Sequence, residues 1–168
     1  METLLEAMIS ELRRETEITR RVLDRVPEDK LDWRPHAKSM TLGQLAFHVA
    51  TIPAGLSQLA ALDAFDAANA NFEPPQPNSK TEVLAALDGG TENAASFLRT
   101  INMTSADEPW RLALRGREIF AMPRATMLRS LLFNHWYHHR GQLSVYLRLL
   151  DLPVPVIYGR SADENPFA

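Results

Sequence analysis

Four long segments of this sequence carry apolar residues at spacings of three and four, which restricts those segments to amphipathic helices. They run from about Glu2 to Val26, from Thr41 to about Leu62, from Ser79 to Ile101 and from Pro123 to about Leu150. Four such helices bury their apolar faces most simply by packing against one another. The pattern predicts an all-α four-helix bundle, and a length of 168 residues suits a single domain over 1–168.

Local signals mark the starts of two helices and a weak point inside one of them. Thr41 and Gln44 have the spacing of a capping box, and Ser79 and Glu82 repeat it. Pro53 falls inside the second helix, where it must remove one backbone hydrogen bond and favours a kink.

The segment from Trp110 to Met122 differs from the helices because its apolar residues alternate with others. Arg115 and Gly116 suit a turn, so a small β-hairpin is predicted between the third and fourth helices. Pro153 and Pro155 prevent the fourth helix from continuing. The remaining C-terminal tail is expected to be irregular and to pack against the bundle.

The apolar stripe of the first helix is interrupted by polar residues at Glu15, Thr16 and Thr19. One explanation is a drift in helical phase that leaves the middle turn partly exposed. The other is that these side chains face a pocket. The sequence leaves both open.

Three of the five histidines fall between Asn134 and Gln142. His135 and His139 differ by about 40° in direction and stand one helical turn apart, the spacing at which two rings bind one metal ion. His138 lies about 60° from His135 on the other side of the apolar stripe, which favours a boundary position. This stripe is expected to contain Leu128, Leu131, His135, Gln142, Val145, Tyr146 and Leu149.

A third ligand must come from elsewhere, because catalytic zinc usually takes three protein ligands and keeps an open position. His48 lies on the inward face of the second helix, whereas His36 lies in a loop beside Pro35. With no cysteine in the chain, a metal would need nitrogen or oxygen ligands. The sequence favours a metal site formed by His48, His135 and His139. Hydrogen-bonded core histidines and a pH-responsive cluster remain alternatives.

The next three residues, Arg140 to Gln142, lie close to the predicted site in the sequence. Gln142 shares the face of the paired histidines and either orients one ring by a hydrogen bond or is a polar residue at the bundle end. Arg140 points away from that face, which favours solvent or a subunit interface. Gly141 indicates either close approach of another backbone or simple tolerance of a weak helical position.

Several classes of partner are disfavoured. The formal net charge is −3, so the chain lacks the basic character that nucleic acids attract. The N-terminal residues mix acids and bases, unlike a signal peptide, and no apolar stretch approaches the roughly 18 residues of a membrane span. We expect a cytoplasmic protein that binds neither nucleic acid nor membrane.

Longer stretches then suggest a family. They are Leu31 to Pro35, Ser39 to Leu45 leading to His48, Trp110, Asn134-His135, His138 to Gln142, and Pro153 to Glu164. Together they resemble the DinB family, also called DinB/YfiT-like metalloenzymes. The resemblance implies a four-helix bundle, often a homodimer, with a divalent metal bound by one histidine of the second helix and two of the fourth. By position these are His48, His135 and His139.

The resemblance also implies a kind of activity, since relatives include transferases and isomerases that use low-molecular-weight bacterial thiols. We therefore expect a divalent-metal-dependent enzyme that acts on a small-molecule substrate. The leading hypothesis is a transferase that uses a low-molecular-weight bacterial thiol as its cosubstrate. A metal-dependent hydrolase and a non-catalytic, metal-stabilised bundle are the alternatives. Zinc, nickel and iron all suit nitrogen ligands, and the sequence does not select one.

Overall fold

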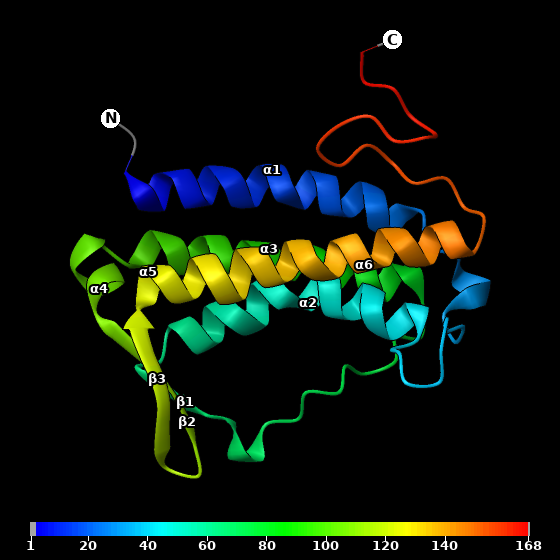
Figure 1. Cartoon of the computed structure of the whole chain (residues 1–168). Helices are drawn as coiled ribbons and strands as arrows, with labels where there is room; N and C mark the ends of the chain where they lie inside the picture. The colour runs from blue at the N-terminus through cyan, green and yellow to red at the C-terminus, as the bar shows by residue number, and fades with distance from the viewer. Residues whose placement is uncertain (1–2, 168) are drawn as a thin grey trace.

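The computed structural model describes residues 3–167 and contains four long helical rods side by side (Figure 1). Three are single helices, α1 (Leu4–Asp24), α2 (Leu42–Ala60) and α3 (Lys80–Thr100). The fourth joins α5 (Arg124–Met127), the π-helical segment η3 (Leu128–Asn134) and α6 (His135–Leu149). α1 and α2 each pack against both α3 and α6, which confirms the predicted bundle. Glu2 and Ala168, at the expected ends, lie outside the described residues.

The order of the rods requires a long crossover. α1 and α6 run in one direction and α2 and α3 in the other, so α2 and α3 are parallel neighbours (Figure 1). Residues 61–79 therefore cross back along the bundle before α3 begins, a connection known in other helical bundles. This crossover carries β1 (Ala64–Asp66) and the short helix η2 (Ala67–Asn69).

The predicted hairpin is confirmed and is part of a small sheet. β2 (Pro109–Leu114) and β3 (Arg117–Pro123) pair antiparallel, and the turn between them has φ values of 53° at Arg115 and 75° at Gly116. β1 pairs parallel with β2 and was not predicted. Two short helices complete the chain, η1 (Glu28–Lys30) and α4 (Met103–Asp107).

Helix caps fix where the bundle helices begin. Thr41 and Gln44 form the predicted reciprocal capping box at α2. Ser79 accepts the backbone N–H of Glu82 as predicted, but the Glu82 carboxylate accepts the N–H of Asn78 at 2.7 Å, one residue before the cap. Both arrangements satisfy N–H groups that a helix start leaves without partners.

The expected inner stripe of the fourth rod is partly wrong. Its buried line after the π-helical segment passes through Trp136, Leu143 and Leu147, whereas Val145 and Leu149 are 56% and 57% exposed. A π-helix bonds each residue to the fifth along, so it has more residues per turn than an α-helix. The segment η3 therefore shifts the helical phase between Leu128 and α6.

The bond lost at Pro53 is replaced from a neighbouring helix. A proline nitrogen carries no hydrogen, so it cannot donate to the carbonyl of Val49, four residues earlier. The indole N–H of Trp136, in α6, donates to that carbonyl at 2.8 Å, and α2 continues through the proline. Val49 and Trp136 are both fully buried.

The outer face of α1 is largely polar. Arg13, Glu17 and Arg21 are exposed on it, while Leu12 and Val22 are buried. Within residues 3–167, no helix is both long enough and apolar enough to cross a membrane.

Candidate metal centre

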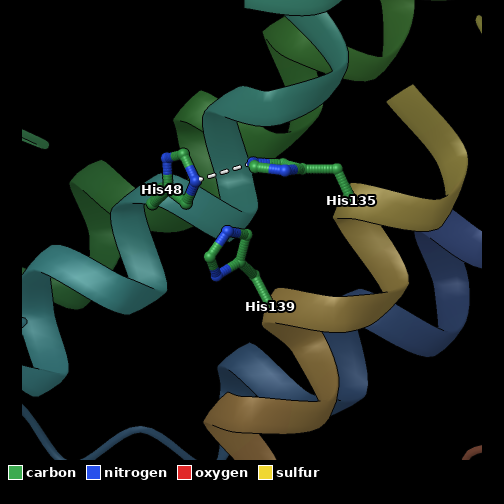
Figure 2. Close-up of side chains that lie close together, drawn as sticks. All are labelled: His48, His135 and His139. Atoms are coloured by element: carbon green, nitrogen blue, oxygen red, sulfur yellow. Dashed lines mark hydrogen bonds between the residues drawn. The ribbon is translucent and has the colours of Figure 1, made fainter. Parts of the chain in front are cut away.

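Three of the histidines meet between α2 and α6. His48 projects from α2, and His135 and His139 project from successive turns of α6 toward it (Figure 2). One ring nitrogen from each lies within 4.8 Å of the others, and the Nε2 atoms of His48 and His135 are 3.1 Å apart. The structure thus brings together the three rings that the sequence selected.

The spacing of the closest pair of nitrogens suits a shared ion. Zinc–nitrogen bonds of about 2.0–2.1 Å in a tetrahedral site place neighbouring ligand nitrogens about 3.4 Å apart. The 3.1 Å separation of the His48 and His135 Nε2 atoms is close to that value. No carboxylate of the described residues joins the cluster, so the donor set is three imidazoles. Such a cluster could hold a metal ion.

Burial keeps the rings neutral. The pKa of His48 is lowered to about 4, mainly because the ring is buried. Repulsion from a positive charge on His139 or His135 lowers it further. Burial and His135 likewise lower the pKa of His139 to about 4, and burial with His138 lowers the pKa of His135. At neutral pH the imidazoles are therefore unprotonated, which metal binding requires.

Gln142 contacts the cluster as one of its two interpretations predicted. Its side-chain Oε1 lies 2.7 Å from Nδ1 of His139. An amide oxygen only accepts hydrogen bonds, so Nδ1 of His139 donates and Nε2 keeps its lone pair. The contact thus favours the tautomer of His139 whose lone pair is on Nε2.

The other two histidines lie apart from the cluster. His138 is exposed, and its ring packs beside His139 without entering the group of close nitrogens. His36 is exposed in the loop before α2, where its Nδ1 accepts the backbone N–H of Lys38 at 3.1 Å.

The polar gap in α1 has a different explanation from the two proposed. Glu15 and Thr19 are only 3% and 0% exposed, so the expectation of a partly exposed turn is wrong for both. They contact Arg140, whose guanidinium is 2.8 Å from the Glu15 carboxylate and 3.1 Å from the Thr19 hydroxyl. Thr16 instead donates to the backbone carbonyl of Leu12 at 2.7 Å.

Two expectations for α6 are also corrected. Arg140 is 1% exposed, so it is neither solvated nor on a free surface. Its buried charge is instead paired with Glu15 of α1. No atom of the described residues lies within 4 Å of where a Cβ on Gly141 would stand, so no other segment among them approaches this glycine closely.

Two residues with polar contacts to the bundle were not predicted from the sequence, one on the arginine side of α6 and one next to the histidine cluster. Tyr158, in the tail, donates its hydroxyl to Glu15 at 3.0 Å and accepts a hydrogen bond from Arg140. Trp136, directly after His135, donates to the Val49 carbonyl. The signal for Trp136 was present, because Pro53 leaves the carbonyl of Val49 in need of a donor.

Fold and site together define a four-helix bundle with a three-histidine cluster between two of its helices. Residues 1–165 match the DinB family, and the chain belongs to that family. The uncharacterised protein YrdA of Bacillus subtilis (strain 168) is 26% identical over 155 residues, covering 89% of this chain and 85% of that protein.

Solved structures show the same fold. A DinB-like protein from Bacillus cereus superposes with a TM-score of 0.71 at 24% identity, covering 91% of this chain and 97% of its own. The DinB-like protein YjoA of Bacillus subtilis gives a TM-score of 0.69 at 18% identity, covering 92% and 99%. At these identities the likeness concerns the fold.

Proposed function

We propose that this protein is a divalent-metal-dependent enzyme whose metal is bound by His48, His135 and His139. The observation that supports the proposal is the meeting of three neutral imidazoles, from two helices, with their nitrogens within 4.8 Å. Membership of the DinB family is compatible with such a site. All three rings are only partly buried, which leaves a route for a substrate.

Each protein group has a defined part. The imidazoles supply neutral donors, and Gln142 holds the His139 ring in the required tautomer. A divalent ion with three nitrogen ligands would keep a position open and favour the deprotonated form of a thiol or water that reaches it. Zinc, nickel and iron each suit these donors.

Thiol transfer is the leading reaction. The chain has no cysteine, so the thiol must be a small-molecule cosubstrate, for which a low-molecular-weight bacterial thiol is proposed. The reaction would form a bond between the thiol sulfur and an electrophilic carbon of the second substrate. The bond from that carbon to its leaving group would break, and the thiol proton would be released. Hydrolysis by an activated water is the second candidate.

The test combines metal analysis with turnover. Wild type, His135→Ala and His138→Ala are each loaded with zinc, nickel or iron and analysed for bound metal. The loaded proteins are then incubated with bacterial thiols and model electrophiles. We expect His135→Ala to lose metal and turnover together, and the exposed neighbour His138→Ala to keep both.

The principal rival is a bundle whose metal only stabilises the fold. Metal that binds wild type, raises its melting temperature and supports no turnover with thiols or by hydrolysis would favour that structural role. Wild type that binds no metal would reject both hypotheses.

A homodimer is proposed as the assembled form. The exposed Val145 and Leu149 lie one turn apart on the outer face of α6 and support an apolar contact there. Sedimentation of the purified chain tests this assembly separately from the metal.

A further inference from the structure

Two consecutive contacts join α2 and α6 at the histidine cluster. His48 contacts His135, and the next residues of the two helices, Val49 and Trp136, contact each other. Both pairs are 87 residues apart in sequence. The first pair is half-buried in the cluster and the second is fully buried in the core, so the two contacts point in different directions.

The second contact exists because of a proline. In an uninterrupted helix the carbonyl of Val49 would accept the N–H of residue 53, but residue 53 is Pro53. A buried carbonyl without a donor is costly, and the indole N–H of Trp136 supplies the donor at 2.8 Å. A bond that would normally lie within one helix is thereby made between two helices.

We infer that Trp136 and Pro53 are positioning residues, which set how far α6 lies along α2 and hence where His135 and His139 stand relative to His48. A shift of one residue moves a helix by about 1.5 Å along its axis. Metal–nitrogen distances tolerate only about 0.2 Å. A directional bond adjacent to the cluster restricts this sliding more than apolar contacts, which are non-directional. The functional consequence rests on the proposed metal site.

The chain contains a matched control for this bond. The indole N–H of Trp110 donates to the carbonyl of Leu59, also in α2, at 3.0 Å. Trp110 is 1% exposed, as deeply buried as Trp136. Leu59 lies eleven residues beyond His48, about 16 Å along the helix axis. Loss of the Trp110 donor removes a buried indole bond to α2 but leaves the Leu59 carbonyl with the backbone N–H of Leu62 at 3.2 Å, and only Trp136 acts beside the cluster.

The first experiment compares Trp136→Phe with Trp110→Phe. Each metal-free protein is titrated with cobalt(II), whose visible absorption reports the number and geometry of its ligands. Groups that orient metal ligands typically change affinity by about tenfold to a hundredfold. We expect a loss of that size in Trp136→Phe, and unchanged affinity and spectrum in Trp110→Phe. Equal affinities in the two variants would overturn the inference.

A rescue variant separates positioning from general stability. Pro53→Ala restores a backbone N–H that can donate to the Val49 carbonyl within α2. In Pro53→Ala/Trp136→Phe we expect the melting temperature to recover most of what Trp136→Phe loses, while the cobalt affinity stays low. Recovery of both would mean that Trp136 merely satisfies a carbonyl.

A measurement without metal keeps this inference distinct from the proposed function. In metal-free wild type and Trp110→Phe, we expect a nuclear Overhauser effect between ring protons of His48 and His135. It should weaken in Pro53→Ala/Trp136→Phe. An undiminished signal there would overturn the positioning role, whereas absence of cobalt binding by wild type would reject only the proposed metal enzyme.

Discussion

The two sides of α6 carry polar clusters of opposite character. Toward α1, Arg140 meets the Glu15 carboxylate, the Thr19 hydroxyl and the Tyr158 hydroxyl, so a buried charge has complementary partners. Toward α2, His135 meets His48, and the two facing groups are both imidazoles. One side brings opposite charges together and the other brings together like groups.

That difference separates a structural cluster from a candidate binding site. Buried polar groups are stable when donors meet acceptors, and the arginine side meets this condition with protein atoms alone. Two neutral imidazoles that face each other through Nε2 at 3.1 Å form a hydrogen bond only when one of them carries its proton there, whereas a cation can accept the lone pairs of all three rings at once. The first cluster should therefore govern folding and the second should respond to metal.

The largest expected effect breaks the arginine side. Arg140→Met leaves the buried Glu15 carboxylate without its charge partner, which should cost about 3–5 kcal/mol of unfolding free energy. Glu15→Leu/Arg140→Met removes both charges and should recover most of that loss. Urea unfolding of the metal-free proteins measures both. A single variant as stable as wild type would show that this ion pair is not structural.

Zinc should stabilise the protein only through the histidine side of α6. At a free concentration about 100 times its dissociation constant, zinc should raise the unfolding free energy by about 2.7 kcal/mol. Removal by a chelator should abolish the increase, and His48→Ala should never show it. Arg140→Met should keep the zinc increment despite its lower stability. Identical urea curves for wild type with zinc and with chelator would contradict the metal site.

The sequence could predict features that depend on local patterns. Apolar spacing predicted the four rods, and the Thr41–Gln44 pair predicted the start of α2. The histidine cluster was within reach because His135 and His139 are one turn apart on the same helix. The choice of His48 over His36 depended on placing His48 on the inward face of the second helix and His36 in a loop.

The rest depends on contacts between distant residues. Glu15 and Arg140 lie 125 residues apart, and nothing local distinguishes a buried charge from an exposed one. β1 has three residues and is stabilised by its pairing with β2, so it has no pattern of its own. The phase shift at η3 depends on helical geometry that apolar spacing did not reveal.

Gln142→Leu should weaken the histidine side without unfolding the bundle. The substitution keeps a similar side-chain size but removes the acceptor for Nδ1 of His139. We expect metal affinity to fall by about tenfold to a hundredfold, as for other groups that orient histidine ligands. Competition between the protein and a chelator for zinc measures the change. Gln142 is exposed, so unfolding without metal should hardly differ.

Acid should destabilise the metal-free protein by protonating the histidine cluster. The pKa of His48 and of His139 is about 4 in the folded protein, against an ordinary histidine value of 6.5. Between these two values the unfolded chain therefore binds more protons than the folded one. Their contribution to stability is complete above about pH 6.5 and is lost as the pH falls toward 4. Urea unfolding at pH 7, 6 and 5 should show a shallower pH dependence in His48→Phe/His139→Phe. Equal slopes would refute the shifted pKa values.

The smallest effect tests whether the two sides are independent. Tyr158→Phe removes the hydroxyl that joins Glu15 and Arg140, at a cost of about 1 kcal/mol for one hydrogen-bonding group. The loss should be modest because Tyr158 is 65% exposed, so water can replace the hydroxyl. The tail should stay in place because Glu164 pairs with Arg25 at 2.8 Å.

Zinc affinity should not change in Tyr158→Phe, because the hydroxyl contacts only the arginine side of α6. A tenfold fall in affinity would show that strain passes through α6 from Arg140 to His139. The tail would then contribute to the metal site, and the division between a folding side and a binding side would no longer hold.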